Sequence, residues 1–265
     1  MKMKNAFKTL LLAAAFYLPV QCMAWGTQGH RITGQIAYSY LTPKAKAAIK
    51  AILGDESLAL AGNWADFERS NPEYKFTEVW HYVNLDKGYT LPEIKAYLAQ
   101  DTVTDAYTKL NFLIGELKKK TLGKKQKTFC LHMLIHLVED IHQPMHTAHS
   151  FDKGGNDVHV TWFNNPTNLH TIWDSQLIDF QQMSYTEYAA EINHTTAAQR
   201  AEWQKAPISQ WLYESNVICQ DIYAYSKDGD KISGYTYNFK FIATVNQRLL
   251  QGGVRLAGVL NQLFS

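Results

Sequence analysis

Cysteine is scarce in this sequence, which has three in 265 residues. Cys22 precedes a predicted cleavage point, so Cys130 and Cys219 are the only cysteines expected in the mature chain. In an oxidising compartment they could form a disulfide, and two buried free thiols are an equal alternative. With so few thiols, any metal site is expected to use histidine and aspartate, and ten histidines are present.

Long apolar runs and an excess of one charge sign are also absent. After the leader no segment reaches the ~18 uninterrupted apolar residues of a membrane helix, so we expect no membrane span. The formal charge is +2, and removal of Lys2, Lys4 and Lys8 with the leader changes it to −1. A protein that grips duplex DNA through many phosphate contacts would be more basic. Anionic substrates remain compatible if bound metals supply positive charge.

The first 24 residues have the pattern of a bacterial-type cleavable signal peptide. A basic start precedes an apolar stretch over residues 10–20, and Ala24 is the small residue that signal peptidase prefers before the cut. A lipid anchor at Cys22 fits less well, because the residues before it match a lipobox poorly. We therefore predict a secreted or periplasmic protein, with residues 1–24 removed and residues 25–265 forming the mature domain.

The mature length fits one large domain, and two smaller domains are also compatible with it. No repeat, low-complexity tract or linker divides the chain. Helical periodicity and helix-end residues predict helices over residues 29–40, 42–53, 101–120, 127–142, 168–182, 186–193, 207–226 and 237–264. Only residues 157–163, and less clearly residues 78–85, alternate as strands do. The prediction is a single compact all-α domain with a small β-hairpin at most.

A series of residues suited to metal binding runs through the chain. Its members are Trp25, His30, Asp66, His81, His136, Asp140, His146, His170 and Asp174. Imidazole nitrogen and carboxylate oxygen are common zinc ligands. Trp25 belongs to the series only if it is the mature chain terminus, whose free amino nitrogen and own carbonyl oxygen would chelate a metal.

The strongest local signal is the spacing of the last five members. Residues four apart share a helix face, so His136 and Asp140 converge, and a proline before His146 turns that side chain back. The same spacing recurs at His170 and Asp174. One such pair would more often lie on a solvated face, but two pairs beside bulky apolar residues favour a metal site.

Other residues are ambiguous when taken alone. Asp66 and Arg69 lie one helical turn apart, and such a pair usually lies on the surface and contributes little. His81, in an aromatic segment, is more often packed than ligating. His132 lies four residues before the first pair, and we leave it outside the site as a core or outer histidine. Residues 152–156 form a flexible polar turn.

Taken together, six motifs in order resemble one family. They are Trp25-x4-His, Trp64-Ala-Asp-x2-Arg, Trp80-His-Tyr, His136-x3-Asp-x-His-Gln-Pro-x-His, Gly154-Gly-Asn and His170-x3-Asp-Ser. The chain resembles the secreted zinc-dependent single-strand nucleases and 3′-nucleotidases of fungi and plants, the mung bean nuclease type. The motifs extend from Trp25 to about Asp174. The parent superfamily also contains zinc-dependent phospholipase C, which shares the fold and most ligands.

The resemblance implies a cleft holding three Zn²⁺ ions in an all-helical fold. It assigns the first zinc to Asp66, His81, His136 and Asp140. It assigns the second to His146, His170 and Asp174. It assigns the third to His30, Asp140 and the amino and carbonyl groups of Trp25, so that Asp140 bridges two ions.

The resemblance also implies roles in catalysis and substrate binding. Asp66 would orient the attacking water and Arg69 would lie near the scissile phosphate. Tyr82, Asn84 and Asn156 would surround a nucleobase. Asn84 is aspartate in several fungal relatives, which leaves the base preference open.

Three functions follow as alternatives. The first is hydrolysis of single-stranded DNA, RNA and 3′-nucleotides, giving 5′-phosphorylated products from the strands, with no obligate protein partner evident. The second is phospholipase C activity with the same metals, although those enzymes usually carry glutamate at the position of Asp174. The third is a non-enzymatic zinc-binding module, which would need neither Arg69 nor an aromatic pocket at Tyr82.

Overall fold

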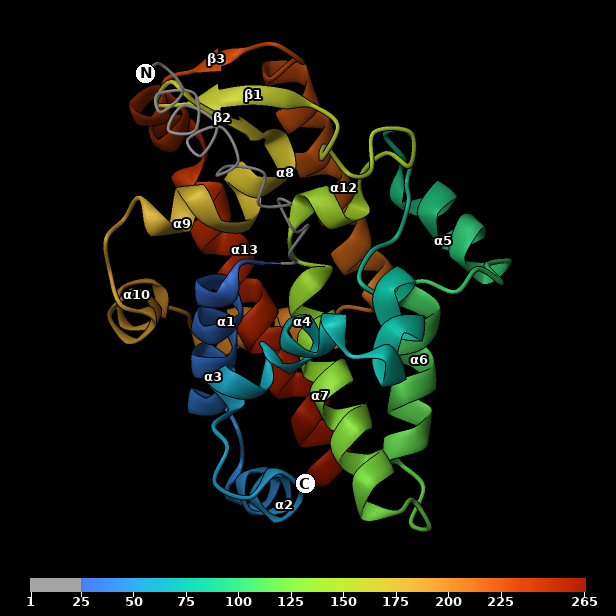
Figure 1. Cartoon of the computed structure of the whole chain (residues 1–265). Coiled ribbons are helices and arrows are strands. Elements are labelled where there is room, and N and C mark those ends of the chain that lie inside the picture. The colour runs from blue at the N-terminus through green and yellow to red at the C-terminus, as the bar shows by residue number, and fades with distance from the viewer. Residues whose placement is uncertain (1–24) are drawn as a thin grey trace, which may run out of the picture.

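The computed structural model describes residues 25–265, so the predicted leader and its cleavage after Ala24 lie outside the described residues. Figure 1 shows helices throughout and a small sheet at one end, as the predicted all-α class requires. The α-helices are α1 (Thr27–Ser39), α2 (Pro43–Leu53), α3 (Leu58–Ala61), α4 (Trp64–Phe67), α5 (Leu91–Ala99), α6 (Ala106–Leu117), α7 (Lys124–Asp140), α8 (Leu169–Thr171), α9 (Leu177–Asp179), α10 (Tyr185–Ile192), α11 (Ala197–Lys205), α12 (Ile208–Tyr225) and α13 (Gly234–Phe264). The remaining elements are the 3-10 segments η1 (Glu68–Ser70), η2 (Pro72–Trp80) and η3 (Pro144–Thr147), the π turn η4 (Ile172–Gln176), and strands β1 (His159–Trp162), β2 (Asn165–Asn168) and β3 (Lys231–Ile232).

Capping side chains set several helix ends. Thr42 caps α2 by accepting a hydrogen bond from the third helical amide, and Gly54 ends it with a φ of 74°. The helix predicted over residues 101–120 begins only at Ala106. The Asp105 side chain accepts a hydrogen bond from the backbone amide of Thr108, the third residue of that helix, and so fixes its start. Helices α5 and α11, which begin after N-cap threonines, were not predicted.

The helix predicted over residues 168–182 is present as one continuous helical run over residues 169–179, in which the π turn η4 lies between α8 and α9. The prediction of a strand over residues 78–85 is wrong. Its first part belongs to η2, and the following residues make isolated backbone hydrogen bonds, from Val83 N to His146 O (2.8 Å), from Leu85 N to Ala148 O (2.9 Å) and from Ala106 N to Tyr82 O (3.0 Å).

The sheet has three strands, one more than the predicted hairpin. β1 and β2 are antiparallel, with Trp162 opposite Asn165. The two residues between them, Phe163 and Asn164, both have positive φ, as tight hairpin turns require. β3 adds two residues in parallel to β1, a long-range pairing for which the local sequence has no signal.

α7 and α13 form the centre of the molecule (Figure 1). Every residue from 130 to 148, which includes the last eleven residues of α7, is buried. A helix buried on all sides lies in a core, so the polar residues at its C-terminal end are held in apolar surroundings. The fold therefore places the metal-ligand pattern of this helix inside the protein.

A buried charged network joins α12 and α13 to the end of α7. Glu214 on α12 accepts hydrogen bonds from Arg248 Nη1 (2.7 Å) and Arg255 Nη1 (2.6 Å) of α13. Arg248 Nε also donates to the carbonyl oxygen of His142, two residues after α7 ends. Both arginines are almost fully buried, so this network fixes the chain that follows α7.

Cys130 and Cys219 are unpaired and buried, so the disulfide alternative is wrong. Among the described residues, no helix combines the length and apolarity that crossing a membrane requires.

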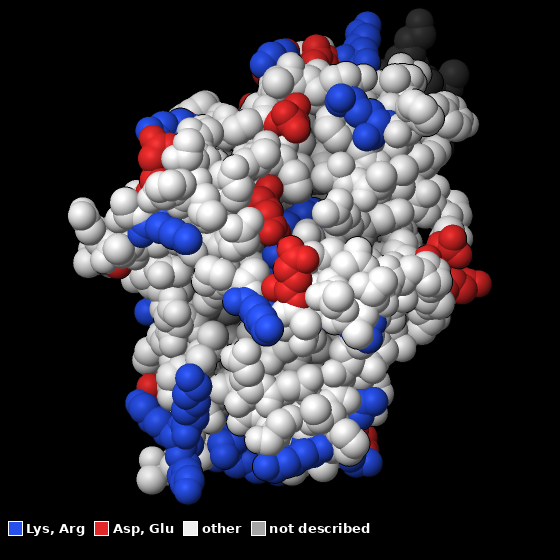
Figure 2. Space-filling model, turned by 180° about the vertical axis from the view of Figure 1, so that it is seen from behind, with Lys and Arg blue, Asp and Glu red and all other residues white. Residues whose placement is uncertain are grey.

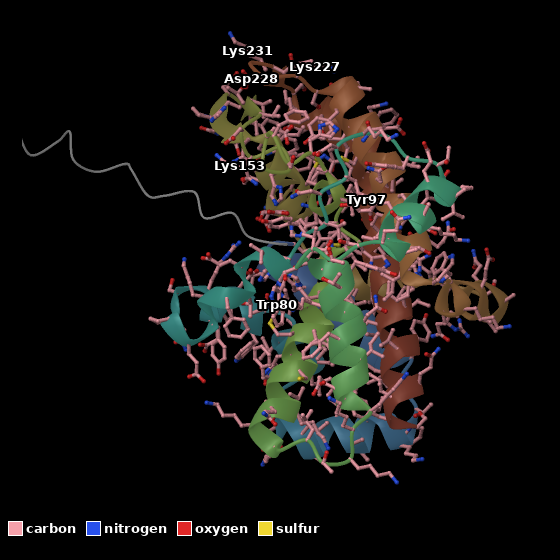
Figure 3. The ribbon with its side chains drawn as sticks, turned by 90° about the vertical axis from the view of Figure 1, so that its right-hand side faces the viewer. Trp80, Tyr97, Lys153, Lys227, Asp228 and Lys231 are labelled. Carbon is pink, nitrogen blue, oxygen red and sulfur yellow. The ribbon has the colours of Figure 1, made fainter. Side chains whose placement is uncertain are left out.

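Charge is distributed unevenly over the surface. Lys and Arg side chains gather at the lower end in Figure 2. This end is formed by α2, which lies across the ends of α6 and α7 (Figures 1 and 3). The sheet, with Lys227 and Lys231 nearby, lies at the opposite end (Figure 3).

Candidate metal centre

The C-terminal end of α7 brings three predicted ligands to one point. His136 Nε2 lies 3.0 Å from Asp140 Oδ2. His81, which follows η2, places its Nδ1 atom 3.0 Å from the same oxygen and 2.8 Å from His136 Nε2. Helical spacing alone predicts the first pair, whereas only the fold brings His81 to it.

Asp66 on α4 and His30 on α1 complete this side of the centre. His30 Nε2 lies 3.8 Å from Asp66 Oδ2 and 3.6 Å from Asp140 Oδ1. The imidazole ring of His30 stacks on that of His136, with centroids 4.3 Å apart. His30, Asp66 and His136 form one ligand group, and His81, His136 and Asp140 form an overlapping one, each with its ligand atoms within 4.8 Å of one another.

A separate group is formed by His146, His170 and Asp174, whose ligand atoms also lie within 4.8 Å. His170 Nε2 is 3.1 Å from Asp174 Oδ2, and His146 Nε2 is 3.8 Å from Asp174 Oδ1. His146 lies in η3, two residues after the proline with which η3 begins, and Asp174 lies in the π turn η4. π turns often occur at functional sites because they redirect side chains within a helix.

The unsatisfied atoms of these groups fit a bound cation. Buried polar atoms in native proteins normally have hydrogen-bond partners. Within residues 25–265, the atoms of the predicted ligands that are buried without a hydrogen-bond partner are His30 Nε2, Asp66 Oδ1 and Oδ2, His81 Nε2, Asp140 Oδ1 and His146 Nε2. They are lone-pair donors or acidic oxygens and they converge, so a metal ion is the partner that would satisfy several at once.

Burial keeps two of the histidines in the neutral form that binds a metal. It lowers the pKa of His30, and it lowers the pKa of His146 to about 3, so both imidazoles stay neutral. Burial raises the pKa of Asp174 to about 6, a shift that a nearby cation would oppose. For His136, burial lowers the pKa but the charge of Asp140 outweighs it and raises the pKa to about 9. A metal ion would take the place of that proton.

Backbone carbonyl groups orient three of the histidines. Nδ1 of His136 lies 2.6 Å from Gly62 O, Nδ1 of His146 lies 2.7 Å from His81 O, and Nδ1 of His170 lies 2.6 Å from Gly154 O. A carbonyl oxygen only accepts, so each Nδ1 carries a proton, and it is Nε2 whose lone pair each ring can give to a metal.

Sequence reasoning missed two residues that contact the predicted ligands. Glu139 is fully buried, and its Oε2 lies 2.6 Å from His30 Nδ1. Gly62 leaves space for this carboxylate, because a Cβ atom there would lie 2.5 Å from the same oxygen. Gln143 donates from Nε2 to Asp174 Oδ1. An acidic residue directly before Asp140, in a helix that is otherwise mostly apolar there, was the signal that could have identified Glu139.

Trp25 is fully buried beside these groups. The following amide, Gly26 N, donates to Asp174 O at 2.7 Å, which attaches this part of the chain to the ligand turn η4. Gly29 lacks the Cβ atom that would lie 3.0 Å from Trp25 Cβ, so α1 packs closely on the tryptophan. Packing of Trp25 against the first helix is therefore present, whatever its backbone atoms bind.

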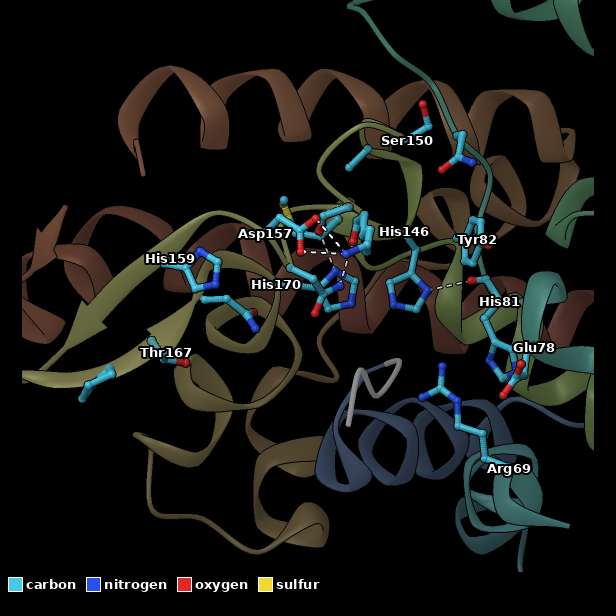
Figure 4. A pocket seen from close by; sticks show the side chains of 18 residues that line it. Arg69, Glu78, His81, Tyr82, His146, Ser150, Asp157, His159, Thr167 and His170 are labelled. Carbon is cyan, nitrogen blue, oxygen red and sulfur yellow. Dashed lines mark hydrogen bonds and ion pairs between the residues drawn. The ribbon is translucent and has the colours of Figure 1, made fainter. Parts of the chain in front are cut away.

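A cleft of about 920 Å³ opens over the groups (Figure 4). Its lining includes the four predicted substrate-contacting residues Arg69, Tyr82, Asn84 and Asn156, together with His81, His146 and His170. The guanidinium of Arg69 points toward the histidines (Figure 4), with Nη1 4.0 Å from Asp66 Oδ1. Asp66 is almost fully buried, so this is no ordinary surface pair. Glu78, Lys153 and His159 also line the cleft and were not predicted.

His132 lies outside the centre, as predicted. Its Nε2 atom is 2.8 Å from Glu56 Oε2, and its ring stacks on Trp64 with centroids 4.8 Å apart.

Comparison with known proteins agrees with this geometry. The family model for S1/P1 Nuclease matches residues 25–265. The chain belongs to the S1/P1 nuclease family. It is 29% identical to Endonuclease 3 of Arabidopsis thaliana over 266 residues, covering 92% of this chain and 90% of the relative. It is 24% identical to Nuclease S1 of Aspergillus oryzae, covering 96% of each chain, and 25% identical to Nuclease P1 of Penicillium citrinum, covering 90% of this chain and 97% of the relative.

Membership confirms the resemblance drawn from the six motifs. It supports a metal-dependent nuclease that hydrolyses nucleic acids. The His and Asp groups at the cleft are the part of this chain that could hold the metals.

Proposed function

We propose that this protein is a secreted zinc-dependent phosphodiesterase that hydrolyses single-stranded DNA and RNA to 5′-phosphorylated products and acts as a 3′-nucleotidase. The observation that carries the proposal is the convergence of three His and Asp groups beside one cleft that also contains Arg69 and Tyr82. A purely structural zinc site would be closed by its ligands and would need neither residue.

We assign three zinc ions to the centre. Asp66, His81, His136 and Asp140 would hold the first, and His146, His170 and Asp174 the second. His30, Asp140 and the terminal amino and carbonyl groups of Trp25 would hold the third. Nitrogen and oxygen donors without sulfur suit zinc at a catalytic site. When bound, the ions supply Lewis-acid stabilisation of the phosphate and a water that loses a proton near neutral pH.

The side chains around the ions perform the positioning. Asp66 accepts a hydrogen bond from the attacking water and so directs it toward phosphorus. Arg69 lies one turn away with Nη1 buried and lacking a hydrogen-bond partner among the described residues, so its charge is available to a phosphoryl oxygen. Negative charge grows on those oxygens as the reaction proceeds, so a fixed cation there stabilises the transition state more than it stabilises the bound substrate.

The aromatic ring at the cleft supports a preference for single strands. Tyr82 is 38% exposed and, with Asn84 and Asn156, lines the same cleft as the histidines. Bases in a duplex are stacked on each other, whereas an unpaired base has a free face for an aromatic ring. The amide side chains would then contact the edge of that base.

Secretion is the remaining element of the proposal. It rests on the signal-peptide pattern of residues 1–24 and on cleavage after Ala24. The proposed third zinc site depends on that cut, because only a free terminal amine can be a ligand.

The test compares substrates with the purified mature protein. Release of acid-soluble nucleotides should be fast from single-stranded DNA, slow from duplex DNA and absent with lecithin. Metal analysis should find close to three zinc ions per chain, and chelation should abolish activity. Preferential hydrolysis of lecithin would favour the phospholipase alternative, and activity with one zinc or none would contradict the proposed centre.

A pair of variants tests the assignment of the bridging ligand. Asp140→Ala should lose more zinc than Asp174→Ala, because Asp140 is proposed to contact two ions and Asp174 one. The number of ions retained after dialysis is the measurement. Equal loss in the two variants would count against a bridging role.

A further inference from the structure

The lysines between residues 44 and 50 and between 118 and 127, which we call the lysine end, form a strongly basic surface. The two segments contain nine lysines and no acidic residue, and the acidic residues within a few positions of them are Asp55, Glu56 and Glu116. The region therefore has six more positive than negative charges, in a mature chain whose formal charge is −1. Most of these lysines are not neutralised. Within residues 25–265, no carboxylate lies within 4.0 Å of Lys44, Lys46, Lys118, Lys120, Lys124 or Lys127.

The two parts of the lysine end are adjacent. Thr128 Oγ1, near the start of α7, donates to the Ile52 carbonyl at the end of α2. Figures 1 and 3 show α2 lying across the turn between α6 and α7, and Figure 2 shows basic side chains gathered there. Like charges repel, so a surface that keeps them together is suited to a polyanionic partner.

Helix α6 connects this surface to the catalytic cleft. Its first amide, Ala106 N, donates to Tyr82 O at 3.0 Å, and Lys118 directly follows its last residue. Twelve residues at about 1.5 Å per residue give a distance of about 18 Å along the helix. A strand with one base at Tyr82 would therefore need only a few further nucleotides to reach the lysine end.

Exposed aromatic rings lie along the way. Phe112 on α6 is 49% exposed and Phe76 on η2 is 56% exposed. Lys109 Nζ lies 5.5 Å from the Phe112 ring centroid and 4.9 Å from that of Trp80, on which Phe76 packs edge-on. Phe112 and Phe76 thus offer exposed ring surface beside a cation, and proteins that bind single strands without sequence preference combine aromatic rings, on which bases stack, with a positively charged surface.

We propose that the face of α6 and η2, together with the lysine end, binds the part of a single-stranded nucleic acid that extends beyond the catalytic cleft. The aromatic rings stack on bases, and the lysines contact phosphates. This inference rests on the proposed nuclease function. It makes the enzyme prefer long strands to short ones, because only long strands reach both sites.

The test uses variants that leave the cleft intact. A triple variant, Lys118→Ala with Lys120→Ala and Lys124→Ala, should raise the KM for a long poly(deoxythymidine) strand roughly tenfold at low salt. The kcat, and both constants for a thymidine dinucleotide, should be unchanged. The slope of log affinity against log salt, measured on the chelated protein with a fluorescent strand, should fall by about 0.7 per lysine, about 2 in all. Phe112→Ala should raise the same KM without changing the salt slope.

The matched control is a variant with Lys227→Ala and Lys231→Ala at the opposite end, which should behave as wild type toward both substrates (Figure 3). An unchanged KM for the long strand in the triple variant would overturn the proposal. Equal effects on strand and dinucleotide would mean that the lysines act through the cleft, and would also overturn it. Loss of binding to phosphatidylglycerol vesicles with unchanged strand binding would identify a membrane surface instead. If wild type cleaves neither substrate, the proposed function fails, which is a separate outcome.

Discussion

Glu139 offers the sharpest test of how the protein prepares its metal ligands. Its carboxylate lies 2.6 Å from His30 Nδ1, and both side chains are fully buried. The other carboxylate oxygen has no hydrogen-bond partner among the described residues. A carboxylate behind a ligand histidine fixes its tautomer and raises its basicity, and loss of such a partner typically lowers metal affinity 10- to 100-fold. Glu139→Gln should therefore weaken binding at His30 by about 1.4 to 2.7 kcal/mol.

The metal-free protein should respond differently. Burial, and then the charges of Asp140 and Asp66, raise the pKa of Glu139 well above its usual range. Without cations the neutral form of this carboxyl group is therefore favoured, and glutamine preserves both its volume and a hydrogen-bond acceptor for His30. The Tm of the chelated variant should match that of wild type. The Tm of the metal-loaded variant should fall by about 3 to 10 °C, because metal affinity contributes directly to stability.

The assay is competition between the protein and a zinc indicator, together with thermal unfolding before and after chelation. Glu202→Gln, at an exposed position on α11, is the matched control and should change nothing. Equal loss of Tm in the metal-free and loaded forms would show that Glu139 is only a packing residue. Unchanged zinc affinity would refute the reasoning outright.

Three further predictions concern other sites. Arg69→Ala should lower kcat on the order of a hundredfold with zinc content unchanged; loss of zinc, or an unaltered rate, would make the residue structural. A chain starting at Ala24 should bind about one zinc fewer than one starting at Trp25, because an amide nitrogen has no basic lone pair; equal zinc content and rate would exclude the terminal ligand. Glu214→Gln should cost about 3 to 5 kcal/mol of unfolding free energy, because Arg248 and its neighbouring arginine would be buried without an anion. Burial raises the pKa of Glu214, but the two arginines outweigh it and lower the pKa to about 2, so its contribution is complete above pH 4.5 and is lost as the pH falls from 4.5 to about 2. Denaturant unfolding across that range should show a shallower acid loss in the variant, and parallel curves would contradict the assignment.

The helical architecture was largely predictable because its signals are local. Thr42 and Gly54 mark the two ends of α2, and the spacing of apolar residues identifies α7 and α13. The strand expected over residues 78–85 was wrong because alternation over so few residues is a weak signal, and residues 78–80 instead complete the 3-10 segment η2. β3 could not be predicted, because its two residues gain their pairing only from β1.

The candidate site also contains residues that local spacing predicts and residues that only the fold brings together. Helical spacing places His136 beside Asp140 with no knowledge of the fold, since four residues complete about one turn. His81 and His30 reach them only because η2 and α1 pack around the end of α7. Their separation from α7 along the chain does not predict that they lie close to it in space. Periodicity therefore could not select His81 and His30 as candidate ligands, whereas the order of the motifs and the family resemblance did.

The sequence by itself determined the family, the helical class and the residue types of the metal centre, because these depend on local pattern and on motif order. Only the tertiary structure decided which atoms face one another. It places Glu139 against His30, and it lets the Nδ1 atoms of His136 and His146 hydrogen-bond to backbone carbonyl groups. It also brings the two segments of the lysine end together. These arrangements arise from packing between elements that are far apart in the chain. A hydrogen bond depends on the distance and angle between its partners, and residue order alone does not give these for distant elements.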